Sequence, residues 1–490
     1  MRQMIRTART LILCGASCAG AELSAQQRPT TAALVAFIDS AAPATLRGGP
    51  VAGLSILVAR GSTVLVDTAY GYADLENGVP ASRQTVYEVG SVTKQFTAAA
   101  IMRLVEQGKV HLDDDVAPYF PRFPFGGRHV TIRQLLTHTS GIHNYVELPT
   151  RDTFLRLPLS RDSLLATIYG APFDFEPGMQ WRYSNTGYHM LGMIIEAVSG
   201  ISYPDFLQRT FFTPLGMMDT RSCNDRPLVP HRARGYEVDA GTLVNAIHFD
   251  QSIMSPAGGV CSTTHDLLTW SRALQSGRAV SAASYRAMAT EARLPNGGPE
   301  TYYGYGLTLT TLAGHRAVWH DGGEPGFRAR VTTFPDDSLV VIVLANTIAP
   351  QNSGSPPANL EIAIDQFALG VPDIQHIVGV ALEHGGVDSA IREYRALRRR
   401  YPAAVFGPDQ LNSVAYASLH AGKVADAISV FRLNVEMFPE DWNAYDSLGE
   451  GYMVHGDKAL AVANYEHSLK LNPANANGTH MLETLKAQSP

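Results

Sequence analysis

The strongest constraint in this 490-residue sequence is an internal repeat near its C-terminal end. A glycine, an alanine, an aromatic residue and a proline recur together after 34 residues. The two sets are Gly422, Ala427, Phe431 and Pro439, then Gly456, Ala461, Tyr465 and Pro473. A fainter copy, offset by 37, holds Gly385, Ala390, Tyr394 and Pro402. A fixed period of this length is typical of stacked helical units, which we expect over residues 374–490.

The clearest unit, AYDSLGEGYMVHGDKALAVANYEHSLKLNP, resembles a tetratricopeptide repeat. The packing positions of its first helix would be Tyr445, Leu448, Gly449 and Tyr452. A small residue lets paired helices approach, the aromatic side chain fills the gap, and the proline ends the second helix. Two clear copies and one faint copy are near the minimum for a stable stack, so we expect the array to lean on the preceding domain. Two interpretations stay open: a platform for a protein partner, or a helical cap without one.

Residues 26–370 show strand patterns at both ends and helical patterns between them. Hairpins are predicted to turn at Arg60–Gly61 and at Asp336–Asp337. NLEIAIDQFAL predicts a closing helix, and residues 370–373 a linker. The sequence therefore predicts an α+β fold, an antiparallel sheet flanked by helices with a helical insert, followed by the all-α repeat domain.

Residues 1–25 have the layout of a secretory signal peptide. Arg2, Arg6 and Arg9 precede a short apolar run and small residues that end in LSA. We therefore predict export to the periplasm or the medium. A lipid anchor on Cys18 fits less well, because Gly15 stands where such sites usually carry an aliphatic residue. No later segment is apolar enough to span a bilayer.

Composition describes a soluble globular protein, with 45% hydrophobic and 17% charged residues and a net charge of -6. Such a charge gives no indication of a nucleic-acid partner. Outside the leader only Cys223 and Cys261 remain, which could pair in an exported chain or stay as two buried thiols. No Cys/His spacing resembles a metal site, so we predict neither a metal nor another cofactor.

Ser91 stands three residues before Lys94 at the head of a predicted helix that stops near Gly108. Of the six lysines in the chain, only Lys94 has a serine at this spacing. Positions i and i+3 of a helix face the same way, so the amine can reach the serine oxygen. A desolvated lysine at a helix N-terminus favours its neutral form, which can take the serine proton. Alone, the pair is more often a helix cap followed by a solvated charge.

Two further motifs favour the chemical interpretation. Tyr183 and Asn185 form the chain's Y-x-N motif, on a loop before an amphipathic helix, where they can protonate a leaving group and hold a substrate carbonyl. His320 opens the H-D-G-G stretch within a strand. Glycine there lets a substrate lie along the strand edge and leaves a backbone N–H for an oxyanion.

S-V-T-K, Y-S-N and H-D-G, with LLTHTSGI at 135–142 between the first two, resemble the serine β-lactamase-like hydrolases. That superfamily includes class C β-lactamases, penicillin-binding carboxypeptidases, D-amino-acid amidases and related esterases. The resemblance implies an acyl-enzyme on Ser91, with Lys94 and Tyr183 as the base system. It also implies substrate binding by Asn185, His320 and Gly322, and an oxyanion hole made by the N–H groups of Ser91 and Gly323.

One position departs from the pattern, because β-lactamases and carboxypeptidases usually carry lysine where this chain has His320. Histidine is only partly charged at neutral pH and is a weaker anchor for a carboxylate. By the resemblance, H-x-G is the form of many esterase- and peptidase-like members. His138 tempts a Ser-His-Asp interpretation, but its place at a helix end favours a structural role. Ser262 or Thr263 is predicted to cap a helix that contains Asp266.

These observations support three hypotheses. The first is an exported serine hydrolase that cleaves an ester or an amide of a small-molecule or peptide substrate. A second is a genuine β-lactamase or D-alanyl-D-alanine carboxypeptidase. The third is a catalytically idle adaptor that uses the repeats to bind a protein. The intact trio of motifs argues against the third, because by the resemblance idle relatives lose the serine or the lysine first.

Overall fold

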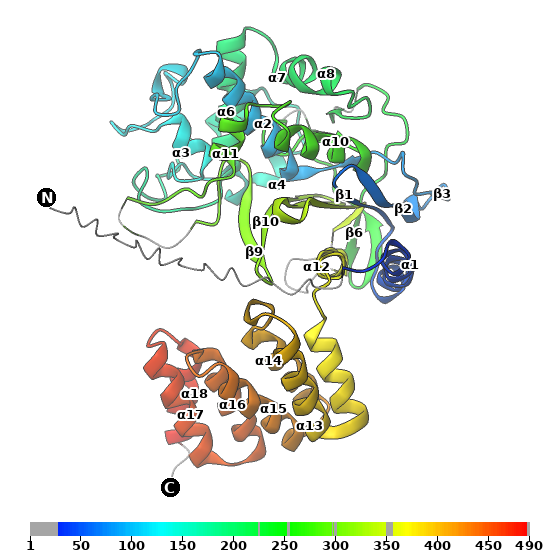
Figure 1. Cartoon of the computed structure of the whole chain (residues 1–490). Helices are drawn as coiled ribbons and strands as arrows, with labels where there is room; N and C mark the ends of the chain where they lie inside the picture. Colours follow the sequence, from blue (N-terminus) through cyan, green and yellow to red (C-terminus); the bar gives the residue numbers. More distant parts are fainter. Residues whose placement is uncertain are drawn as a thin grey trace, which may run out of the picture.

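The computed structural model describes residues 28–223, 226–251, 255–295, 297, 301–348 and 356–487. The predicted signal peptide at residues 1–25 lies outside this range. Figure 1 shows a sheet with helices on both faces and, beyond helix α12 (Pro356–Leu369), a purely helical region. The predicted fold class is therefore confirmed.

A seven-stranded antiparallel sheet forms the centre of the first part, in the order β3-β2-β1-β12-β11-β10-β9. The strands are β1 Gly53–Arg60, β2 Thr63–Asp74, β3 Val79–Pro80, β9 Thr308–Leu312, β10 His315–Glu324, β11 Phe327–Phe334 and β12 Leu339–Ala345. Both predicted hairpins are present, one turning at Gly61 in the left-handed region and one through a 3-10 turn at Pro335–Asp337.

Strands β1 and β12 lie in the middle of the sheet and are buried on both faces, which explains their continuous apolar sequences. Their side chains alternate between two cores. Val340, Ile342 and Leu344 face one core, which contains helix α2 (Thr93–Glu106). Val341 and Val343 face the other, which contains helices α1 (Thr31–Gly48) and α12.

The helical insert between β4 and β9 covers the first of these faces. Its longer helices are α6 Asn185–Ser199, α10 Thr264–Gln275 and α11 Ala282–Met288, and its shorter ones are α3 Ile132–Leu136, α4 Arg151–Phe154, α5 Arg161–Ala166, α7 Tyr203–Leu207 and α8 Thr213–Leu215. Helices α1 Thr31–Gly48 and α12 Pro356–Leu369, the predicted closing helix, cover the opposite face. Two small sheets complete this part, with strands β4 Tyr87–Glu88, β5 Arg221–Ser222 and β8 Val260–Ser262 in one, and β6 Tyr236–Asp239, β7 Thr242–Asn245 and β13 Thr347–Ile348 in the other.

After Asp373 every described element is helical. The helices are α13 Ile374–Arg400, α14 Pro408–His420, α15 Val424–Met437, α16 Trp442–His455, α17 Lys458–Leu471 and α18 Ala476–Ala487, with a 3-10 turn at Ala403–Val405. Helix α13 is broken at Gly386, which has a φ of 71°. The region of the faint repeat is therefore itself a pair of helices.

The repeated positions have the predicted packing. Phe431 and Tyr465 are fully buried, as are Ala427 and Ala461. A Cβ at Gly449 would lie 3.2 Å from the Tyr465 ring, so this glycine permits the close approach of α16 and α17. The glycines at 422 and 456 follow α14 and α16 with positive φ.

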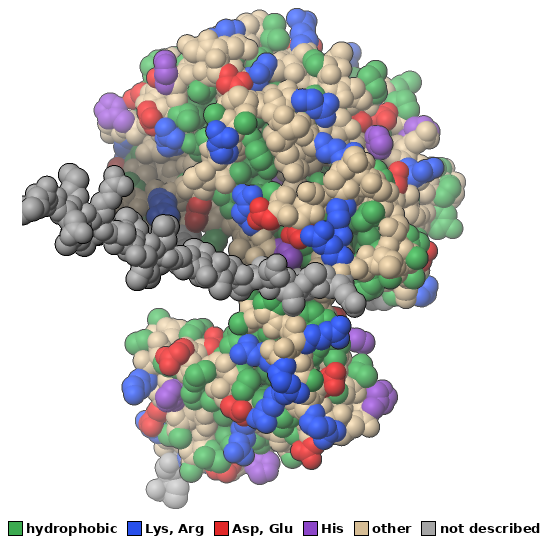
Figure 2. Space-filling model, in the orientation of Figure 1, with side chains coloured by type: hydrophobic (Ala, Val, Ile, Leu, Met, Phe, Trp, Pro, Cys, Tyr) green, Lys and Arg blue, Asp and Glu red, His purple; other side chains and the backbone are tan. Residues whose placement is uncertain are grey.

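The helical region shares a core with the sheet. One cluster of buried apolar side chains runs from α1, β1 and β12 through α12 into α13, α14 and α15, as far as Leu448 of α16. Figure 2 shows Lys and Arg side chains gathered on the visible face of the helical region. Arg399 and Arg400, at the end of α13, are exposed. Among the described residues, no helix has the length and apolarity that a membrane span requires.

Candidate active site

Ser91 lies on a 3-10 turn, Gly90–Val92, that joins β4 to helix α2. Gly90 has a φ of 49°, and a Cβ there would come within 2.8 Å of the backbone nitrogen of Gly323 on β10. A Cβ at Gly322 would lie 2.0 Å from the Val89 carbonyl oxygen and 2.9 Å from the Ser91 nitrogen. Both glycines are therefore required for the contact between the Ser91 turn and β10.

Lys94 is fully buried and points back at Ser91. Its Nζ donates hydrogen bonds to Ser91 Oγ at 3.0 Å, to Asn185 Oδ1 at 2.8 Å and to the Ala257 carbonyl oxygen at 2.8 Å. None of these acceptors carries a charge. Burial lowers the pKa of Lys94 to about 7, although Glu324 and Asp321 oppose the shift. The amine is therefore partly neutral at physiological pH and in contact with the serine oxygen.

Tyr183 and Asn185 complete this side of the site. Lys94 Nζ lies 4.7 Å from the centroid of the Tyr183 ring. Burial raises the pKa of Tyr183 well above its usual value of 10, although Ser91 opposes the shift, and the buried Tyr183 hydroxyl has no hydrogen-bond partner among the described residues. Asn185 is the first residue of α6, and its backbone N–H donates to Asn144 Oδ1 at 3.1 Å. The side-chain oxygen Oδ1 of Asn185 already accepts a hydrogen bond from Lys94. The side-chain nitrogen Nδ2 is therefore the group left to donate to a substrate carbonyl.

His320 is 2% exposed, and both of its ring nitrogens are engaged. Nε2 pairs with the Tyr303 hydroxyl at 2.8 Å, and Nδ1 with the Asp321 carbonyl oxygen at 2.5 Å. Burial lowers the pKa of His320 to about 4, although Asp321 opposes the shift. The ring is therefore neutral at pH 7, not partly charged as the sequence led us to expect, and it supports Tyr303 instead of facing a substrate anion.

His138 has the structural surroundings that we predicted. It follows α3 with a φ of 60°, its Nδ1 accepts from the Ser184 backbone N–H at 3.1 Å, and its ring packs 4.3 Å from that of Tyr183. Burial lowers its pKa well below 6.5, so it stays neutral. These contacts hold the loop that carries Tyr183.

Two further sequence predictions concern the segment around residue 262. Thr263, one of the two predicted caps, accepts from the Asp266 backbone N–H at the start of α10. Ser262 instead pairs with the Thr220 hydroxyl. Cys223 and Cys261, which the sequence left open, form a disulfide.

Two residues near the site were not predicted from the sequence. Tyr303 lies on the loop before β9 and has ring contacts with His138, Trp181 and Tyr183. Glu324 ends β10 and is 4% exposed. Strand alternation could have identified Glu324, because positions 320, 322 and 324 share one face. No comparable pattern marks Tyr303.

The structure thus brings Ser91, Lys94, Tyr183 and Asn185 into one contact group, with Gly322 and Gly323 against the serine turn. The arrangement offers a hydroxyl, a partly neutral amine and nearby backbone N–H groups, the requirements for acyl transfer. Within the described part of the chain, no group of three His, Cys, Asp or Glu side chains is placed to hold a metal ion.

Comparisons with known proteins identify the family of this chain. A family model described as Beta-lactamase matches residues 38–363. Penicillin-binding protein 4* of Bacillus subtilis (strain 168) is 34% identical over 310 residues, which cover 60% of this chain and 67% of that protein. For further relatives, the protein flp of Staphylococcus aureus, the chain spans 62% of their length.

Among solved structures, the octameric penicillin-binding protein homologue from Pyrococcus abyssi is 30% identical with a TM-score of 0.60, covering 69% of this chain and 77% of that one. D-amino acid amidase from Ochrobactrum anthropi SV3, complexed with D-phenylalanine, is 25% identical with a TM-score of 0.60, covering 69% and 98%. The family match includes Ser91, Lys94, Tyr183 and His320 and extends over well more than half of the chain. The chain therefore belongs to the Beta-lactamase family of serine hydrolases.

Proposed function

We propose that this protein hydrolyses an ester or an amide through an acyl-enzyme on Ser91. The observation that carries the proposal is the 3.0 Å contact between Lys94 Nζ and Ser91 Oγ, made by a fully buried lysine whose three acceptors are all uncharged. A serine hydroxyl needs an adjacent base, and a desolvated amine can be that base.

In the first step, Ser91 Oγ bonds to the substrate carbonyl carbon while its proton passes to the Lys94 amine. The N–H groups of Ser91 and Gly323 hold the oxyanion that forms. The bond to the leaving group then breaks, and the leaving group takes a proton delivered through Lys94 and Tyr183. Water attacks the resulting ester, which releases the acid and restores the Ser91 hydroxyl. The Asn185 amide nitrogen positions the substrate carbonyl.

An ester or amide substrate fits better than a carboxylated β-lactam. His320 is buried, neutral and engaged by Tyr303, so it offers no cation to a substrate carboxylate. The solved relative named D-amino acid amidase gives a precedent for amide cleavage in a similar fold.

The proposal is tested with a fluorophosphonate probe and labelled penicillin on the full chain, with Ser91→Ala as the control. We expect Ser91-dependent labelling by the phosphonate and slow or no turnover of penicillin. Rapid penicillin turnover would instead support a β-lactamase or carboxypeptidase. Absence of Ser91-dependent labelling by either probe would leave the adaptor hypothesis.

We also propose that the protein is exported and that residues 374–490 are tetratricopeptide-like repeats that bind a protein partner. The Cys223–Cys261 disulfide supports export, because such bonds persist mainly in oxidising compartments. The approach of α16 and α17 at Gly449 and Tyr465 supports the assignment of the repeats. Cell fractionation tests the first point; full-length protein in the cytoplasmic fraction only would contradict it. For the second, affinity capture is compared between the intact chain and a Gly449→Leu variant, and equal capture would contradict specific binding.

A further inference from the structure

Tyr303 lies at the edge of β10, at the point where the candidate active site begins. The pairing of β9 with β10 ends at Trp319, which lies opposite Thr308. Tyr303 forms a bridge with the same Thr308. Its buried hydroxyl lies 2.8 Å from Nε2 of His320, the next residue of β10. The proposed mechanism gives this tyrosine no role.

The hydrogen bonds of His320 fix the position of its ring proton. The Asp321 carbonyl oxygen can only accept, so its 2.5 Å bond with Nδ1 places the proton on Nδ1. A neutral imidazole carries one N–H group, so Nε2 is an acceptor. The Tyr303 hydroxyl must therefore donate to Nε2. Both ring nitrogens are thus engaged within the protein, and neither is left for a substrate.

The surroundings of His320 keep its ring uncharged. Burial lowers the pKa of His320 to about 4, and the Lys94 amine adds to this shift while Asp321 opposes it. Two other titratable groups nearby, His138 and Tyr183, stay neutral, because burial lowers the pKa of the first and raises that of the second. A proton on Nε2 of His320 would add a buried charge and displace the hydroxyl that donates to it.

The leaving group of a substrate would lie beside His320 and Tyr303. In the proposed mechanism the leaving group takes its proton through Tyr183. The Tyr183 ring centroid is 6.2 Å from that of His320 and 6.3 Å from that of Tyr303. Trp181, which is partly exposed, adds a further ring 6.2 Å from Tyr303. A leaving group at Tyr183 therefore meets aromatic rings and an uncharged imidazole.

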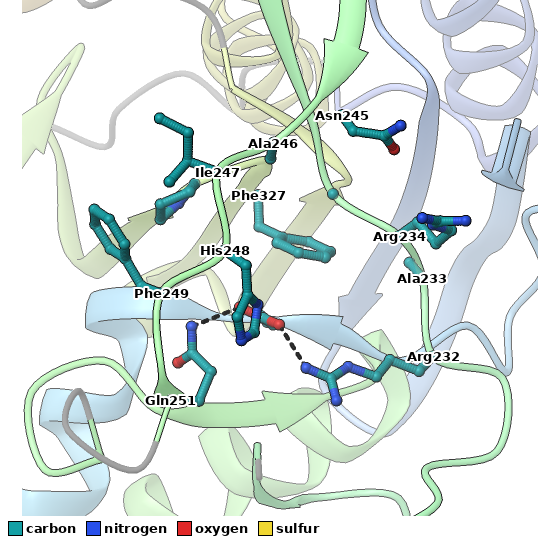
Figure 3. A pocket seen from close by; sticks show the side chains of 13 residues that line it. Arg232, Ala233, Arg234, Asn245, Ala246, Ile247, His248, Phe249, Gln251 and Phe327 are labelled. Carbon is teal, nitrogen blue, oxygen red and sulfur yellow. Dashed lines mark hydrogen bonds and ion pairs between the residues drawn. The ribbon is translucent and has the colours of Figure 1, made fainter. Parts of the chain in front are cut away.

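The arginines near the other end of β10 are already paired. Figure 3 shows Arg232 turned toward a carboxylate, that of Glu88, beside a cavity of about 360 Å³ that Pro325 also lines. Arg232 donates to Glu88 Oε1 at 2.9 Å, and Arg234 pairs with Glu76 at 2.5 Å. Each guanidinium has an anionic partner within the protein, so neither is a free anchor for a substrate carboxylate.

We propose that Tyr303 determines the charge preference of the site. By donating to His320 it holds the imidazole neutral and occupied, so that Ser91 acts on substrates with an uncharged leaving group in preference to those with an anionic one. The inference rests on the proposed function, because it concerns the leaving group of the same acyl transfer. It goes beyond that function by assigning the preference to one hydroxyl, whose removal leaves Nε2 free to take a proton and bind a carboxylate.

The test compares two thioesters whose leaving groups differ in charge, S-benzoyl-mercaptoacetamide and S-benzoyl-mercaptoacetate, on the full chain. Thiol release is measured, and each rate is divided by that of the uncatalysed hydrolysis. The neutral thioester is expected to exceed the anionic one about tenfold or more in kcat/KM, because an unpaired carboxylate is costly to bury. In Tyr303→Phe this ratio is expected to fall about fivefold or more at pH 6 and less at pH 8, because the freed imidazole gains a proton mainly at the lower pH.

Tyr305→Phe is the matched control, because the Tyr305 hydroxyl accepts from Arg133 at 2.6 Å and not from a group of the candidate active site. Its ratio is expected to match that of the wild type within about twofold. Adding His320→Gln to Tyr303→Phe removes the group that gains the proton, so the pH dependence of the ratio should disappear. An unchanged ratio in Tyr303→Phe, or an equal loss on both thioesters, would overturn the inference; the second result would make Tyr303 a purely structural residue.

Nitrogen NMR of the histidine rings tests the inference without a variant of Tyr303. The signals of His320, identified by their loss in His320→Gln, are expected to show a neutral ring with its proton on Nδ1 between about pH 5.5 and 8. A proton on Nε2, or titration of the ring within this range, would overturn the inference.

If neither thioester is turned over, the two are compared as competitors of fluorophosphonate labelling at Ser91. Equal competition by the neutral and the anionic compound would overturn the inference. Absence of any Ser91-dependent labelling would instead reject the proposed function itself.

Discussion

The buried side chains of Arg328 and Lys94, on opposite faces of the sheet, differ in their partners. On the face of helix α12, Arg328 of β11 donates two hydrogen bonds to Glu361, at 3.1 and 3.0 Å. On the face of helix α2, Lys94 contacts only uncharged acceptors and Glu324 contacts no donor among the described residues.

This difference in partners decides whether a buried side chain stays charged or can exchange a proton near neutral pH. Burial alone would lower the pKa of Arg328, but the attraction of Glu361 outweighs it and the net shift is upward, so Arg328 stays charged. Burial also raises the pKa of Glu361, and Arg328 opposes that shift. Without such a partner, burial moves the pKa of Lys94 down and that of Glu324 up, so both become able to exchange protons near neutral pH. Lys94, which has no charged hydrogen-bond partner, is the residue that carries the proposed chemistry.

Replacing Lys94 with a side chain that is always charged has the largest expected effect, a loss of activity. Lys94→Arg replaces a base with a group that cannot lose its proton, so kcat on a p-nitrophenyl ester is expected to fall by about 10²–10⁴-fold. The matched control is Lys109→Arg, at an exposed position just after α2, which should match the wild type. An active Lys94→Arg enzyme would exclude lysine as the base.

Breaking the Arg328–Glu361 pair has the next largest expected effect, a loss of stability. Glu361→Gln leaves Arg328 buried beside a neutral group, and the free energy of unfolding is expected to fall by roughly 3 kcal/mol. Urea unfolding monitored by circular dichroism measures the change. The double variant Arg328→Met with Glu361→Leu should recover most of the loss. No loss in the single variant would mean that the pair does not stabilise the fold.

The decrease in kcat/KM at acidic pH should follow the protonation of the Lys94 amine. Its pKa of about 7 predicts that kcat/KM falls about tenfold for each pH unit below 7, as the amine gains a proton. His320, with a pKa of about 4, and Tyr183, far above 10, do not titrate in this range. The inflection should persist in Glu324→Gln; its disappearance there would assign it to Glu324 instead.

The last expected effect concerns stability in the Glu324→Gln variant, and it depends on pH. The folded protein holds Glu324 neutral up to about pH 8, whereas the unfolded chain ionises it near 4.5. Its contribution to stability is therefore present below pH 4.5 and is lost as the pH rises to 8. Glu324→Gln should match the wild type within about 1 kcal/mol at pH 4.5 and become relatively more stable toward pH 8. A constant difference across this range would show that Glu324 is not held neutral.

Much of this architecture could be predicted from local pattern. The S-x-x-K spacing brought Lys94 to Ser91 because i and i+3 share a helix face, and the hairpins at Gly61 and Asp336–Asp337 followed from strand and turn residues. The repeat period predicted the burial of Phe431 and Tyr465.

Features that depend on contacts between distant segments could not be predicted in this way. The ionisation of His320 depends on burial and on Tyr303, which comes from a loop without a periodic pattern. The pairing of Cys223 with Cys261 depends on β5 lying beside β8, a register that neither short strand encodes alone. The contact of Asn185 with Lys94 spans 91 residues of sequence.

The apolar cluster that runs from the sheet through α12 into α13–α16 bears on how the molecule melts. Two domains joined only by a flexible linker would unfold in separate steps. Here the sheet and the first repeat helices share one apolar core, so the unfolding of either part would expose apolar side chains of the other. A calorimetric scan of the intact chain should therefore show the sheet and the first repeats melting in one transition. The helices from α17 onward, whose small cluster is separate, are the segment able to fray before it.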